Sequence, residues 1–182
     1  MMEESNPVKE YLFNYIKSES SITKLLDEGK FSSIIDIILQ KCYDKITSIG
    51  NKNESLAVMA TGILHYLLTN ALIPSQRKVK KNGIEVDIVI PDLKTLENDP
   101  EKTLIIHIPK HSNKDSILQE IKNLQEIQPI QQNIWIVLTE KISLDFKTYY
   151  VSKYESTFSK IIYDIGNFTN VNNNNKFKIL RI

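Results

Sequence analysis

Residues 77–90 read RKVKKNGIEVDIVI and carry the clearest structural signal in the chain. The pair Asn82-Gly83 strongly favours a two-residue hairpin turn, because both residues readily take a positive φ. The flanking residues are rich in β-branched side chains, which favour strands. The sequence therefore predicts a β-hairpin with strands at 77–81 and 84–90. An acid, Asp87, lies within the apolar part of the second strand.

The sequence on either side of the hairpin predicts further helices and strands. A broad apolar face precedes the hairpin, and a continuous apolar run at 134–139 is typical of a strand covered on both faces. The expected elements around the hairpin are a helix over 54–72, a strand at 103–108, a helix over 112–128, a strand at 134–139, a sheet extension at 149–151, a helix over 154–165 and a strand at 177–182. This order predicts an α/β protein with a mixed sheet flanked by helices.

The first fifty residues predict helices. Apolar side chains recur every three or four positions around Leu12 and again around Ile35, and Gly29 separates the two stripes. We expect residues 1–50 to form a helical extension, which packs on residues 51–182 or makes a homodimer. Residues 51–182 are expected to form the α/β domain.

Composition limits the classes of function. The chain has 182 residues, with 23 Lys and Arg against 22 Asp and Glu, so a nucleic-acid contact needs a local basic patch. The single cysteine, Cys42, excludes an internal disulfide, and no apolar run is long enough for a membrane helix. The acidic N-terminus does not fit a secretory signal. These features predict a cytoplasmic protein without a membrane contact.

The helix–strand–strand–strand–helix–strand order of residues 54–139 resembles the core of the PD-(D/E)xK nuclease superfamily, which has a restriction-endonuclease-like αβββαβ fold. Asp87 lies where Holliday-junction-resolvase-like members carry a metal-binding acid. Glu54, at the start of the preceding helix, resembles a second metal-binding acid, and Lys110 has the place of the catalytic lysine. The resemblance implies catalytic roles for Asp87, Lys110 and Glu54. It also implies Mg²⁺ bound by Asp87 and Glu54 in an active enzyme, and DNA or RNA as the partner.

The chain departs from the family pattern at one position. The third strand should end in an acid two residues before the lysine, and it reads Ile108-Pro109-Lys110 instead. Strand alternation puts His107 on the face opposite Ile108, so His107 does not replace the acid unless the strand bulges. Two alternatives stay open at this stage. Asp92, in the literal Pro-Asp pair, offers a second register, and another acid can enter the site (Glu85, Glu97, Asp99 or Glu101).

Each site residue also has a simpler interpretation. Asp87 fits an acid on the solvent face of an edge strand or one paired with a lysine. Glu54 fits a helix-dipole acid, and Lys110 fits an exposed lysine at a strand end. The histidines His107 and His111 have no nearby cysteine and match no known zinc spacing.

Basic residues of the first hairpin predict a phosphate-binding surface. The expected contacts are Arg77, Lys78, Lys80, Lys81 and Lys114. A charged edge that prevents strand pairing explains the same pattern. Two hypotheses follow: a nuclease-like domain with a degenerate site that binds nucleic acid or serves assembly, and a structural or protein-interaction domain that dimerises through its helices. An active Mg²⁺-dependent nuclease is the less favoured form of the first, because of Ile108.

Overall fold

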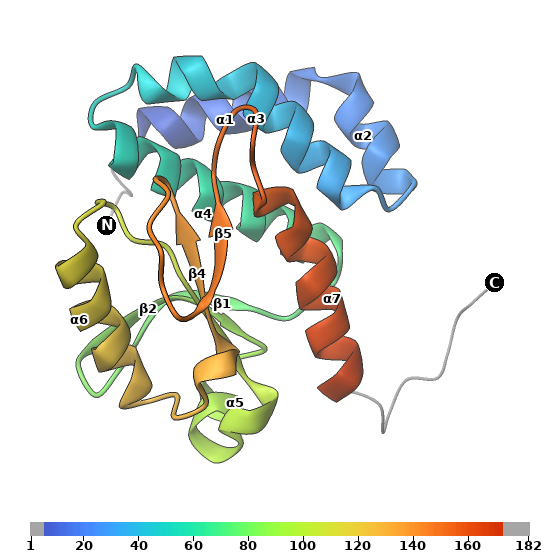
Figure 1. The fold of residues 1–182 in the computed structure, drawn as a ribbon. Coiled ribbons are helices and arrows are strands. Elements are labelled where there is room, and N and C mark those ends of the chain that lie inside the picture. Colours follow the sequence, from blue (N-terminus) through green and yellow to red (C-terminus); the bar gives the residue numbers. More distant parts are fainter. Residues whose placement is uncertain (1–5, 173–182) are drawn as a thin grey trace.

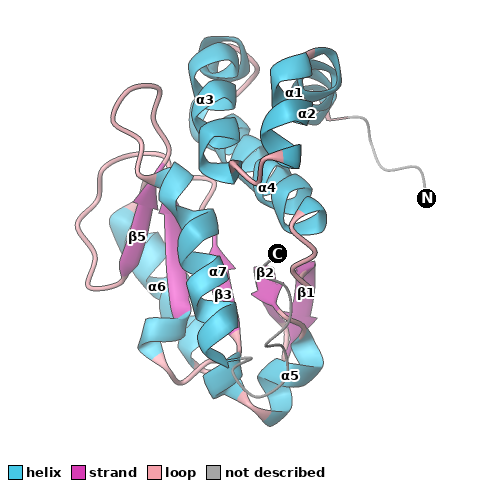
Figure 2. Ribbon diagram, turned by 90° about the vertical axis from the view of Figure 1, so that its right-hand side faces the viewer, coloured by secondary structure: helices cyan, strands magenta, loops and turns pink. Residues whose placement is uncertain are grey.

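The computed structural model describes residues 6–172 as an α/β protein with a five-stranded mixed sheet flanked by helices (Figure 1). Helices α1–α4 form a layer at one end, and Figure 2 shows α4 lying between α1 and α3 and the sheet. The main elements are α1 (Pro7–Ser18), α2 (Ser20–Asp27), α3 (Phe31–Thr47), α4 (Lys52–Asn70), β1 (Gln76–Lys81), β2 (Ile84–Ile90), α5 (Leu93–Asn98), β3 (Leu104–His107), α6 (Lys114–Gln125), β4 (Ile134–Leu138), β5 (Lys147–Tyr150) and α7 (Ile161–Asn172).

The predicted hairpin is confirmed and begins the sheet. Asn82 and Gly83 have φ values of 52° and 79°, as a tight turn with two positive φ angles requires. The strand order is β1-β2-β3-β4-β5, antiparallel from β1 to β3 and parallel from β3 to β5. Helix α6 makes the crossover between the parallel strands β3 and β4. The hairpin and this crossover place the ends of β2 and β3 beside α6.

The N-terminal helices pack inside the chain. Three helices form where the sequence indicated two, because Glu19 ends α1 and its carboxylate caps α2 through the backbone N–H of Ser21. The stripe Val8, Leu12 and Ile16 is buried against the neighbouring helices. The core that contains these residues is continuous across position 50 and includes one face of the sheet. The stripes that motivated the expected homodimer are therefore already covered within one chain.

Some sequence-based boundaries differ from the structure. Residues 154–157 are not helical, and the expected helix is a short 3-10 turn (Phe158–Lys160) followed by α7. Helix α5 was not expected, and the carboxylate of Asp92 caps it by accepting the backbone N–H of Thr95 at 2.7 Å. The second register at Asp92 is therefore a helix cap. The expected strand at 177–182 lies outside the described residues. In the described part, no helix combines the length and the apolar character that crossing a bilayer requires.

The two faces of the sheet carry separate cores. Ile88, Ile106 and Ile108 face the layer of α1–α4 and α7. Ile105 and Ile136 face α5 and α6. Burial of apolar surface on both faces explains why β3 and β4 read as continuous apolar runs.

Candidate functional site

Strands β2 and β3 separate at Asp87, and this separation creates the site. Their ladder runs from Ile90↔Leu104 to Ile88↔Ile106 and goes no further. At the next position the Asp87 carboxylate accepts the backbone N–H of Ile108, with 2.8 Å between Oδ2 and N. A side-chain carboxylate thus accepts the backbone N–H of Ile108, which in a regular sheet would donate to a backbone carbonyl of the neighbouring strand.

Strand β2 also rotates at this point. Ile88 faces the core of α1–α4, and regular alternation would place Val86 on the same face. Val86 instead packs in the core beside α6. Lys78 lies opposite Asp87 in the register of β1 and β2 and has a positive φ of 50°, which is unusual for lysine. The two strands are therefore distorted together around Asp87, which lies in an inner strand and not at an edge of the sheet.

His107 connects two carboxylates. Its Nδ1 lies 2.8 Å from Asp87 Oδ2, and its Nε2 lies 2.8 Å from Glu120 Oε2 on α6. Glu120 Oε1 lies 2.8 Å from Nε2 of His111. The His107 side chain is 13% exposed, whereas the other three side chains are 22–39% exposed. We call Asp87, His107, Glu120 and His111 the histidine–carboxylate network.

The network keeps His107 positively charged. Burial alone would lower the pKa of His107, but the hydrogen bonds with Asp87 and Glu120 outweigh it and raise the pKa from 6.5 to about 9. The hydrogen bond from His107 lowers the pKa of Glu120 to about 2, although partial burial opposes this change. At neutral pH an imidazolium therefore lies between two carboxylates, and both of its ring nitrogens donate hydrogen bonds.

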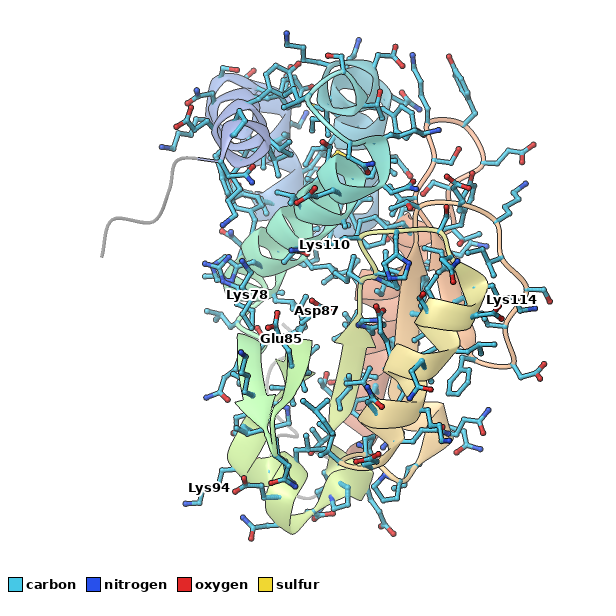
Figure 3. All side chains as sticks on the ribbon, turned by 90° about the vertical axis from the view of Figure 1, so that its left-hand side faces the viewer. Lys78, Glu85, Asp87, Lys94, Lys110 and Lys114 are labelled. Carbon is cyan, nitrogen blue, oxygen red and sulfur yellow. The ribbon has the colours of Figure 1, made fainter. Side chains whose placement is uncertain are left out.

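Two cavities share Asp87, and we call them the network cavity and the central cavity. The network cavity has a volume of about 440 Å³ and is also lined by His107, Glu120 and Lys110. The central cavity has a volume of about 80 Å³ and lies between β1, β2 and α4. Glu85 and Lys110 line both cavities, and Figure 3 shows them near Asp87 and Lys78.

The structure groups only two of the three residues expected to be catalytic. Asp87 and Lys110 line the same two cavities. Glu54 is exposed in the first turn of α4 and lines neither of them. Glu85 is the one open alternative that reaches the site, because Glu97, Asp99 and Glu101 lie on α5 and the turn after it.

The residues present do not fit the expected Mg²⁺ site. Asp87 and Glu54 are not brought together, and Ile108 is buried in the helical core. In residues 6–172, no three histidine, cysteine or acidic side chains are grouped so that they can hold a metal ion. In the network, both ring nitrogens of His107 already lie 2.8 Å from carboxylate oxygens of Asp87 and Glu120.

The predicted phosphate-binding residues separate into two groups. Arg77 and Lys78 line the central cavity with Lys110, and Lys9 of α1 joins them there. Lys80 lies 3.9 Å from Glu85, with both side chains largely exposed. Lys81 and Lys114 do not line the cavities that contain Asp87, and Figure 3 shows Lys114 on α6, away from Lys78.

Sequence reasoning did not find Glu120 or Lys9. Both are polar residues of amphipathic helices, and nothing in the local pattern separates them from other solvent-facing charges. The available clue in the sequence was the spacing of His107 and His111, which lie four residues apart and both contact the carboxylate of Glu120.

Comparison of the chain with family models, with curated proteins and with solved structures gives no match.

Proposed function

We propose that this chain is a nuclease-like domain that binds the phosphate backbone of nucleic acid and does not cleave it. The order α4-β1-β2-β3-α6-β4, with the short helix α5 inserted between β2 and β3, supports a restriction-endonuclease-like αβββαβ core, with α1–α3 as an N-terminal helical extension. In this proposal the chain keeps the fold and the lysine of PD-(D/E)xK nucleases, and the histidine–carboxylate network stands where those enzymes bind metal.

A connected basic surface is the observation that carries the proposal. Five cations line adjoining cavities between α1, β1 and the end of β3: Lys9, Lys17, Arg77, Lys78 and Lys110. None of the five forms an ion pair with another described residue. Unpaired cations on one surface suit a polyanion, because each phosphate contact releases counterions. We call these five residues the basic groove.

The surroundings of the Asp87 carboxylate support the part of the proposal that the chain does not cleave nucleic acid. Its Oδ2 already accepts hydrogen bonds from His107 and from the Ile108 backbone. The imidazolium of His107 neutralises one carboxylate of the site, so the site has less charge to attract a divalent cation. The acid that would complete a two-carboxylate site is replaced by the buried Ile108.

Charge reversal in the basic groove tests the proposal. We expect the double variant Lys78→Glu and Lys110→Glu to bind a labelled DNA duplex at least tenfold more weakly than the unmodified chain. The slope of log K against log salt should also become shallower by about 2, because two phosphate contacts are lost. Lys94→Glu is the matched control, since Lys94 is exposed on α5, far from the groove (Figure 3). Fluorescence anisotropy over a salt series measures both quantities.

Two outcomes contradict the proposal in that experiment. Equal affinity of the double variant and the Lys94 control would place the contact elsewhere on the surface. No binding of duplex, branched or single-stranded DNA or RNA by the unmodified chain would leave the protein-interaction hypothesis. In that case the concentration dependence of the oligomeric state is the next measurement.

A cleavage assay tests the second half of the proposal. We expect no cleavage of labelled DNA or RNA with Mg²⁺ or Mn²⁺, and binding that does not change when EDTA is added. Metal-dependent cleavage that disappears in both Asp87→Ala and Lys110→Ala would contradict this expectation. Glu85, the other carboxylate that lines both cavities, would then be the first ligand to test.

A further inference from the structure

A third cavity lies between α1, α4 and β1 and has a volume of about 570 Å³. It differs from the other two cavities because two phenyl-type rings, those of Phe13 and Tyr66, line it together with cations, whereas the central cavity has the Phe13 ring alone and the network cavity has neither. The six residues that matter are Lys9, Phe13, Lys17, His65, Tyr66 and Arg77. We call it the aromatic cavity. Its volume is in the range of small-molecule sites, and it is large enough for one nucleotide.

Close packing of two helices positions one of the rings. Gly62 of α4 faces α1, and a Cβ atom at this position would lie 2.9 Å from Cδ2 of Leu12 and 3.9 Å from Cζ of Phe13. The ring of Phe13 therefore lies at the line of contact between α1 and α4. Tyr66 follows Gly62 by four residues and so projects from the same side of α4. Both rings are only half-buried.

The aromatic cavity has a net positive charge. Lys9, Lys17 and Arg77 line it, and Glu10 is the one acid among its lining residues. Burial lowers the pKa of His65, and the charges of Arg77 and Lys9 lower it further. His65 is therefore neutral at pH 7, and its ring adds a flat surface without an added charge.

The aromatic cavity continues into the central cavity. Lys9, Phe13 and Arg77 line both of them. The central cavity in turn leads to Lys78 and Lys110. A nucleic-acid backbone that follows the basic groove thus passes the aromatic rings at one end of its path. Base faces are buried by stacking inside a duplex, so only an unpaired base can lie against these rings.

We propose that the aromatic cavity holds an unpaired nucleotide of the bound nucleic acid, with its base on Phe13 and Tyr66 and its phosphates at Lys9, Lys17 and Arg77. This inference rests on the proposed function and adds a substrate class to it. The preferred ligand is a duplex with a single-stranded extension or a branch, and a blunt duplex is the poorer ligand.

Two labelled DNAs test the inference, a blunt duplex and the same duplex with a single-stranded extension. We expect the unmodified chain to bind the extended duplex about tenfold more tightly, in the range that stacking of one base provides. The double variant Phe13→Leu and Tyr66→Leu should lose this preference and keep its affinity for the blunt duplex. Tyr163→Leu, at a 69% exposed tyrosine of α7, is the matched control and should keep the preference.

A fluorescent base analogue gives a second reading. 2-Aminopurine placed in the extension should be quenched on binding the unmodified chain, because stacking on an aromatic ring quenches it. It should stay bright with the double variant. If that variant does not fold, Lys17→Glu replaces it, since Lys17 is exposed on α1 and lines the aromatic cavity but not the central cavity. Lys17→Glu should reduce the preference for the extended duplex.

The outcomes separate this inference from the proposed function. Equal binding of both DNAs, with a bright 2-aminopurine, overturns the inference and leaves the proposed function standing. A double variant that weakens both DNAs equally also overturns it. Binding of neither DNA overturns both proposals.

Discussion

Replacing His107 with leucine is expected to lower the free energy of unfolding by about 3 kcal/mol at pH 7. In the folded chain His107 lies between Asp87 and Glu120, 2.8 Å from an oxygen of each. Leucine leaves two carboxylates facing one another in a partly buried place without the cation that separates them. The cost is that of breaking a buried ion pair by removing one partner, reduced because Glu120 is partly exposed.

His111→Leu is the matched control for this prediction. His111 also bonds to Glu120, but its side chain is 39% exposed and water can replace the lost contact. We expect this variant to lose less than about 1 kcal/mol. Urea denaturation of the three proteins measures the difference. Equal stability of the His107 and His111 variants would mean that the network does not stabilise the fold.

The ion pair between His107 and Glu120 predicts how the free energy of unfolding changes with pH. The pKa of His107 is raised from 6.5 to about 9, so its contribution of about 3 kcal/mol is complete below pH 6.5 and is lost as the pH rises through 9. The pKa of Glu120 is lowered from 4.5 to about 2, so its contribution is complete above pH 4.5 and is lost as the pH falls through 2. In His107→Leu the loss of stability between pH 6.5 and 9 should disappear.

Replacing Phe158 with alanine is expected to lower the free energy of unfolding by about 3–5 kcal/mol. Phe158 is fully buried, and it is among the largest side chains in the core. It lies in the 3-10 turn that precedes α7, and this turn packs against α3. Its ring thus connects the end of the described chain to the N-terminal helices, and its removal leaves a large apolar cavity.

Tyr154→Ala is the control for Phe158→Ala, because Tyr154 lies four residues earlier and is 84% exposed. We expect it to change stability by less than about 0.5 kcal/mol. Thermal and urea unfolding followed by circular dichroism compare the two variants. A loss below about 1 kcal/mol for Phe158→Ala would mean that the turn does not hold α7 on the core.

Local signals in the sequence predicted the central part of the fold. The Asn82-Gly83 turn fixed the β1–β2 hairpin, since both positions have a positive φ in the structure. The apolar run of β4 indicated a strand covered on both faces, and all five of its residues are buried. These features depend on neighbouring residues, so one sequence was enough to find them.

The site depends on contacts between distant residues, and the sequence predicted less of it. Asp87 and Lys110 lie together as expected, but no local rule indicates that Glu120, 33 positions after Asp87, completes the network. Strand alternation was expected throughout β2, and the rotation between Val86 and Ile88 breaks it. Glu54 was expected near Asp87 from the resemblance alone, and the helix that carries it presents Ala57 and Thr61 to the central cavity instead.

The hydrogen bond from Ile108 to Asp87 makes one backbone amide sensitive to a side chain. Amides in a regular ladder are protected from hydrogen exchange by a carbonyl group, which does not titrate in the accessible pH range. The Ile108 amide is protected by a carboxylate that His107 holds in place. Its exchange rate thus follows the charge of His107, whose pKa the hydrogen bonds with the two carboxylates raise to about 9, so one amide resonance provides a built-in reporter of the centre of the site.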